Sequence, residues 1–77
     1  MVLHDRLWRY REKLDQGEVD ADLDQAERAA VSRLLMAAIT ILDTYGATPA
    51  DHLARMCRDE TVPPRVNERV AKIISEA

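Results

Sequence analysis

The longest apolar run in the chain constrains its fold more than any other feature. It covers residues 34–42 and reads L-L-M-A-A-I-T-I-L, in which Thr40 has the only polar side chain. It lies in a stretch of roughly twenty residues that contains neither glycine nor proline. Apolar residues recur there at helical spacing in two stripes: Val31, Leu35, Ala38, Leu42 and Tyr45, and Ala30, Leu34, Ala37 and Ile41. Such a helix must be covered from several sides, which predicts the central helix of a small bundle.

Length and composition indicate one small folded domain over residues 1–77. The apolar fraction of 47% and the charged fraction of 32% are ordinary for a folded soluble chain. The central run is too short for a bilayer, which requires ~20 apolar residues, so no membrane segment is expected. A single cysteine, Cys57, and the lack of a secretory signal pattern at the N-terminus predict a reducing, cytoplasmic location.

Local start and stop signals predict four helices. Leu3, Leu7, Tyr10 and Leu14 form one apolar stripe, and Gly17 follows as a helix stop, so a first helix is expected over residues 2–16. Asp24 and Glu27 have capping-box spacing, which starts the central helix over residues 24–45. Gly46 ends it. The fold class is therefore predicted to be all-α, a single-domain bundle of about four helices around the central helix.

The second half of the chain supplies the two shorter helices. Thr48 is the expected N-cap of a helix over residues 49–58, with Leu53, Met56 and Cys57 inward. The double proline at 63–64 then predicts a last helix over residues 64–76. The core is expected to comprise Leu35, Ala38, Leu42, Leu53, Val70 and Ile73, with Leu7 and Tyr10 packed against it.

The residues that catalysis or metal binding requires are sparse. His52 and Cys57, five residues apart on one helix, would point about 140° apart. Asp20, Asp22 and Asp24 have the spacing of a calcium loop, but Gln25 and Val31 occupy the positions that need glycine and glutamate. We therefore predict no catalytic, cofactor-binding or metal-binding residues, no cofactor and a protein that is not an enzyme.

Interaction with another protein is the leading functional hypothesis, as a regulator, adaptor or inhibitor. The candidate partner-binding residues are an aromatic and basic set on the first helix and an acidic set after it: Trp8, Arg6, Arg9, Lys13, Glu18, Asp20 and Asp22. The simpler interpretation of the basic stripe is a solvated face, with Asp5 and Arg9 paired. The apolar stripe of the first helix also makes a homodimer possible.

The alternative hypothesis is a DNA-binding regulator that uses residues 49–76 as a helix-turn-helix-like pair. Its candidate contacts are Arg65, Asn67, Arg69 and Lys72. The acidic residues Asp59 and Glu60 between the two helices would repel phosphates, and so would the net charge of −3. Nucleic acid is therefore not the expected partner.

Overall fold

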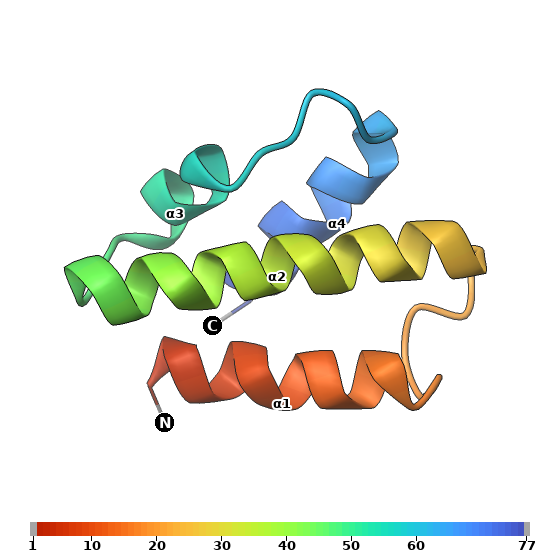
Figure 1. The fold of residues 1–77 in the computed structure, drawn as a ribbon, viewed down its shortest axis with the longest axis horizontal. Helices are drawn as coiled ribbons and strands as arrows, with labels where there is room; N and C mark the ends of the chain where they lie inside the picture. Colours follow the sequence, from red (N-terminus) through yellow and green to blue (C-terminus); the bar gives the residue numbers. More distant parts are fainter. Residues whose placement is uncertain (1, 77) are drawn as a thin grey trace.

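The computed structural model describes residues 2–76, which form four α-helices and no strand (Figure 1). The helices are α1 (Leu3–Asp15), α2 (Gln25–Tyr45), α3 (Ala50–Met56) and α4 (Pro64–Ser75). Each boundary lies within two residues of the predicted one. The all-α prediction is confirmed, although Met1 and Ala77, the ends of the predicted domain, lie outside the described residues.

Helix α2 forms the centre of the bundle (Figure 1). Helix α1 runs antiparallel along one side of it, whereas α3 and α4 lie on the other side. The chain turns by 117° between α2 and α3. Within residues 2–76 no single helix is both long and apolar enough to cross a membrane, and α2 and α3 reach that length and composition only as this bent pair.

The helix ends follow the local signals at most positions. The Asp24 carboxylate accepts from the Glu27 amide at 2.8 Å, and Glu27 accepts from the Asp24 amide at 3.1 Å, so the capping box is present. Gly17 adopts φ 76°, and the Glu18 amide donates to the Lys13 carbonyl at 2.9 Å in a Schellman turn. The Thr48 prediction was wrong, because Pro49 is the N-cap of α3 and the Thr48 hydroxyl donates to the Gly46 carbonyl.

The core lies where α2 meets the other three helices. The predicted Leu35, Ala38, Leu53, Val70 and Ile73 are all buried, as is Leu7, and Tyr10 is half-buried against them. The core also contains residues outside that prediction: Leu14, Leu23, Val31, Leu34, Ile39, Cys57, Val66 and Ile74. Two buried polar residues, Glu27 and Ser32, lie on α2.

Three residues expected to be inward are not buried. Leu42 is half-buried, whereas Tyr45 is 73% exposed. Helix α1 is shorter than α2. His4, in the first turn of α1, lies level with Asp43, so α1 does not cover the last turn of α2. Met56, at the end of α3, is 44% exposed because Leu53 and Cys57 occupy the inward face of that short helix.

Candidate protein-docking surface

An internal ion-pair cluster joins α1, the following loop and α4. The Tyr10 hydroxyl donates to the Asp20 carboxylate at 2.9 Å. The Arg69 guanidinium donates to Asp20 and to Asp22. The Asp20 side chain is only 6% exposed, and its backbone adopts φ 57°. We call Tyr10, Asp20, Asp22 and Arg69 the Asp20 cluster.

Contacts within the Asp20 cluster shift the pKa values of several of its members. Burial, followed by the hydrogen bond to Asp20, raises the pKa of Tyr10 above its ordinary value, so the phenol stays protonated. The hydrogen bond from Arg69 lowers the pKa of Asp22, and those to Asp22 and Asp20 raise the pKa of Arg69. Two residues expected to meet an acidic or basic partner, Asp20 and Arg69, therefore bind each other.

The side chains of the remaining DNA-binding candidates also contact other residues of the chain. Arg65 donates to the buried Glu27 through Nε and one terminal nitrogen, Nη2. The Asn67 amide donates to the Asp59 carbonyl at 2.7 Å and accepts from the Asp59 amide at 3.1 Å. Lys72 lies 3.9 Å from Glu76. Phosphate contacts through Arg65 and Arg69 would require these pairs to open, which disfavours α4 as a nucleic-acid-binding helix.

The basic candidates on α1 have a different environment. Arg9 and Lys13 are exposed, and Arg6 is half-buried with its guanidinium 3.5 Å from the Ile73 carbonyl. The expected pairing of Asp5 with Arg9 is not formed, because Asp5 instead accepts from His4 at 3.3 Å. Glu18 is exposed as well. Among the sequence candidates, these charges and Trp8 are the ones available to a partner.

Two contacts fix the antiparallel register of α1 and α2. His4 Nε2 lies 2.9 Å from Asp43 Oδ1, and the Ser32 hydroxyl donates to Asp15 at 3.2 Å. The two contacts are eleven residues apart along each helix. Arg11 lies seven residues beyond His4, and Met36 seven residues before Asp43. The same register therefore places Arg11 level with Met36, on the same side of the two helices.

An exposed aromatic and apolar patch occupies this α1–α2 seam. Trp8 is 41% exposed and Met36 is 36% exposed. The Arg11 guanidinium carbon lies over the Trp8 ring, 5.7 Å from its centroid. A cation held over an indole face in this way is a favourable contact. We call Trp8, Arg11 and Met36 the seam patch.

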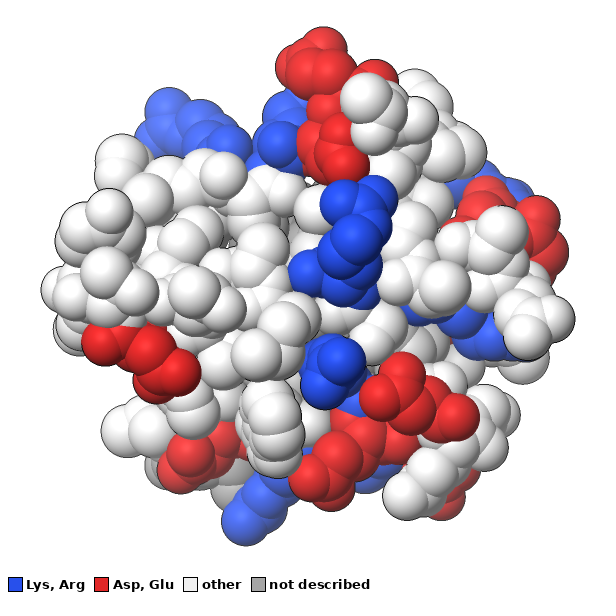
Figure 2. Space-filling view, viewed as in Figure 1, with Lys and Arg blue, Asp and Glu red and all other residues white. Residues whose placement is uncertain are grey.

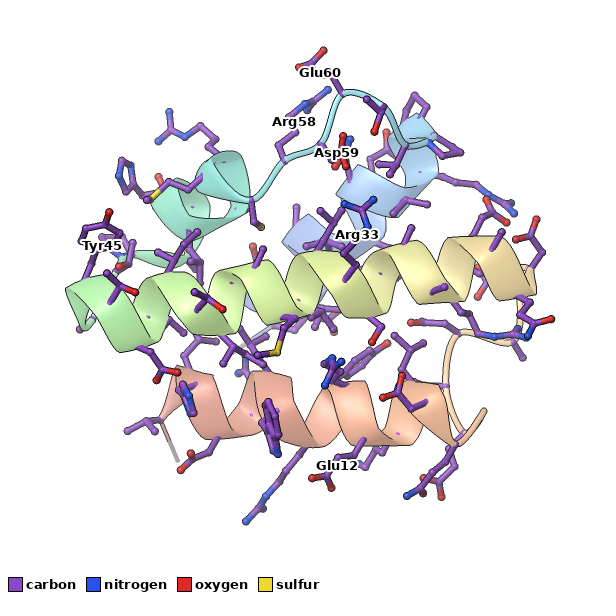
Figure 3. The ribbon with its side chains drawn as sticks, viewed as in Figure 1. Glu12, Arg33, Tyr45, Arg58, Asp59 and Glu60 are labelled. Atoms are coloured by element: carbon purple, nitrogen blue, oxygen red, sulfur yellow. The ribbon has the colours of Figure 1, made fainter. Side chains whose placement is uncertain are left out.

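The outer face of α2 continues the seam patch as a surface with few charged groups. Its exposed residues at helical spacing are Ala26, Ala29, Arg33, Met36, Thr40, Asp43 and Thr44. Both ionised groups among them have partners within the chain: Arg33 lies 3.0 Å from Asp59, in the segment between α3 and α4 (Figure 3), and Asp43 lies 2.9 Å from His4. In Figure 2 most charged side chains gather at the border and in the right half of this face, and a continuous uncharged area covers the left part, over the C-terminal half of α2.

Reactive groups elsewhere do not assemble into a site. Cys57 is 5% exposed, and burial raises the pKa of its thiol. His52 is exposed on the outer side of α3. Within residues 2–76 no three His, Cys, Asp or Glu side chains are grouped so that they could hold a metal ion.

Comparison with known proteins does not identify the chain. No protein-family model matches it, and no curated protein or solved structure matches it. Sequence reasoning selected Trp8 but missed Arg11 and Met36, because their proximity depends on the register of α1 against α2.

Proposed function

We propose that this protein is a small non-enzymatic interaction module that docks on a larger protein, as a regulator, adaptor or inhibitor. The observation that supports this most strongly is the seam patch, in which an exposed tryptophan and an exposed methionine lie beside the outer face of α2, a surface with few charged groups. Tryptophan and arginine are the residues most often found as binding hot spots. Apolar surface of this kind is characteristic of protein-binding sites.

Covering Trp8 would contribute measurably to the affinity of a complex. Trp8 is 41% exposed, which leaves about 100 Å² of its surface for a partner to cover. At about 25 cal/mol per Å², full coverage contributes at most about 2.5 kcal/mol, or roughly sixtyfold in affinity. Met36 and the alanines of α2 would extend the contact.

Self-association remains a second form of the same hypothesis. The apolar stripe of α1 is already used within the chain, because Leu7 and Leu14 are buried and Leu3 and Tyr10 pack against the core. A homodimer would therefore need a surface other than that stripe, such as the seam patch. We also propose that the protein works in the cytoplasm, where a lone cysteine such as Cys57 stays reduced.

Affinity capture with matched variants tests docking. The tagged wild-type chain is compared with Met36→Ser and with Met56→Ser, which changes a methionine of similar exposure on α3. A partner that uses the seam patch is captured by wild type and by Met56→Ser, and its recovery falls several-fold with Met36→Ser. Equal recovery with all three chains, at equal thermal stability, contradicts this location of the docking surface.

A further inference from the structure

The charged residues of α1 form two stripes, and Trp8 lies with the acidic one. Successive residues of a helix are rotated by about 100°. By that spacing, three acidic side chains lie within about 60° of the direction of Trp8: Asp5, Glu12 and Asp15. Three basic side chains lie about 100–160° away from it: Arg6, Arg9 and Lys13. The basic stripe is therefore on the side of α1 away from the seam patch.

The three acidic residues beside Trp8 are exposed and only partly compensated. Asp15 accepts from the Ser32 hydroxyl, which is a neutral donor. Glu12 points away from the helix (Figure 3) and has no ion-pair partner within residues 2–76. Asp5 contacts the His4 ring at 3.3 Å. A partner can therefore reach all three carboxylates.

Helix α2 adds a fourth carboxylate to the same face. Asp43 is exposed and lies seven residues after Met36, which places both on one stripe of α2. His4 Nε2 lies 2.9 Å from Asp43 and its Nδ1 lies 3.3 Å from Asp5, so one imidazole contacts two carboxylates. In Figure 2 acidic side chains lie on both sides of an uncharged area over α1, in the lower part of the view. We call these four residues the acidic border: Asp5, Glu12, Asp15 and Asp43.

The positive charge on this face is smaller. Arg11 is the only lysine or arginine of α1 that lies within about 60° of Trp8, and its guanidinium carbon lies over the Trp8 ring. On the outer face of α2, Arg33 is paired with Asp59. One guanidinium and one shared imidazole do not balance four carboxylates. The seam patch is therefore an apolar surface with a net negative border.

We infer that the partner presents a basic segment to the seam patch, with a large apolar side chain against Trp8 and Met36 and lysine or arginine side chains that reach the acidic border. This inference rests on the proposed docking function and adds the chemistry of the partner. Opposite charges across an interface raise the rate of encounter and select against wrong partners. Because Arg9 and Lys13 would repel such a segment, it runs along the seam between α1 and α2 and does not cross α1.

Two other occupants fit this surface less well. In a symmetric dimer the same patch faces itself, so the acidic border of one copy would meet that of the other. A nucleic acid would bring its phosphates to the same carboxylates, which repel them. A basic protein segment matches both the apolar centre and the charged border of the surface.

The test uses the full chain to select from a library of displayed random peptides. Enriched sequences are expected to place lysine or arginine on both sides of a large apolar residue. The selected peptide is then titrated while Trp8 fluorescence is followed, because Trp8 is the only tryptophan and belongs to the patch. A blue shift of its emission is expected as the ring is covered.

A control peptide separates docking from general charge attraction. It keeps every basic residue of the selected peptide and has serine in place of the large apolar residue. It should bind roughly tenfold more weakly, because it cannot cover Trp8 and Met36 with apolar surface. Equal binding of the two peptides overturns the inference.

Two charge-matched double variants locate the peptide on the seam. Asp5→Asn with Glu12→Gln removes two charges of the acidic border. Glu60→Gln with Glu68→Gln removes two exposed charges elsewhere, one between α3 and α4 and one on α4. The first pair should weaken binding roughly three- to tenfold at low salt and less at high salt, while the second changes it less than about twofold. Where Asp5→Asn lowers thermal stability, Glu12→Gln alone should still weaken binding about twofold. Equal weakening by both pairs, or none by the first, overturns the inference.

Other outcomes separate this inference from the docking proposal. A neutral or acidic consensus that still shifts Trp8 emission overturns the basic partner and leaves docking intact. Failure to enrich any peptide overturns the inference, while affinity capture tests docking independently. Stronger quenching by a single-stranded oligonucleotide than by the peptide, or a Trp8 shift with protein concentration alone, identifies a nucleic acid or a second copy and also overturns it.

Discussion

Replacing Arg69 with alanine is predicted to destabilise the fold, because Arg69 neutralises a nearly buried carboxylate. The Asp20 side chain is 6% exposed, and without Arg69 its remaining side-chain donor is the Tyr10 hydroxyl. Removing one member of a buried ion pair typically costs about 3–5 kcal/mol. Arg69 is itself 24% exposed, so water can partly replace it, and we expect about 2–4 kcal/mol. That is a large share of the stability of a domain this small.

Urea unfolding followed by far-UV circular dichroism measures this cost. Arg55→Ala is the control, since its pair with Asp51 is highly exposed and should contribute less than about 0.5 kcal/mol. Asp20→Asn completes a double-mutant cycle, because asparagine tolerates the positive φ at this position. Additive effects of Asp20→Asn and Arg69→Ala, or a loss from Arg69→Ala no larger than that from Arg55→Ala, would refute the reasoning.

Three further predictions concern the core, the acid response and the thiol. Leu35→Ala should cost about 3–5 kcal/mol and Leu42→Ala about 1–2 kcal/mol in urea unfolding, because Leu35 is fully buried and Leu42 is not; equal losses would contradict this. The hydrogen bonds from Arg65 lower the pKa of Glu27 from 4.5 to about 2, so its contribution to stability is present above pH 4.5 and is lost as the pH falls toward 2. A urea midpoint that stays constant from pH 5 to pH 2.5 would be inconsistent with that. Cys57, buried and with a raised thiol pKa, should react with iodoacetamide at pH 8 slowly in the native chain and rapidly in urea.

The helix boundaries were predictable because the signals that set them are local. The Asp24–Glu27 capping box, Gly17 and Pro64 each act within a few residues of the helix end they define. The same local reasoning failed at Thr48, where the hydroxyl bonds to Gly46 instead of capping α3. Fold class therefore follows from the sequence, whereas the choice between two competing local hydrogen bonds does not.

The candidate site was only partly predictable because it depends on contacts between distant residues. Asp20 and Arg69 are 49 residues apart, and each alone resembles a surface charge available to a partner. The acidic loop and the basic stripe of α4 did contain a signal, since two complementary runs in a four-helix chain can bind each other. The burial of Ile39 and the position of Met36 depend on the register that His4–Asp43 and Asp15–Ser32 fix.

Site-specific photo-cross-linking in cells tests the docking surface most directly. A photoreactive amino acid is placed at Met36 in one chain and at Met56 in another, two exposed positions on different helices. If the seam patch is the docking surface, Met36 gives a discrete cross-linked species that Trp8→Ala weakens, and Met56 gives none. Cross-links at Met56 with none at Met36, or Met36 cross-links that Trp8→Ala leaves unchanged, would contradict it.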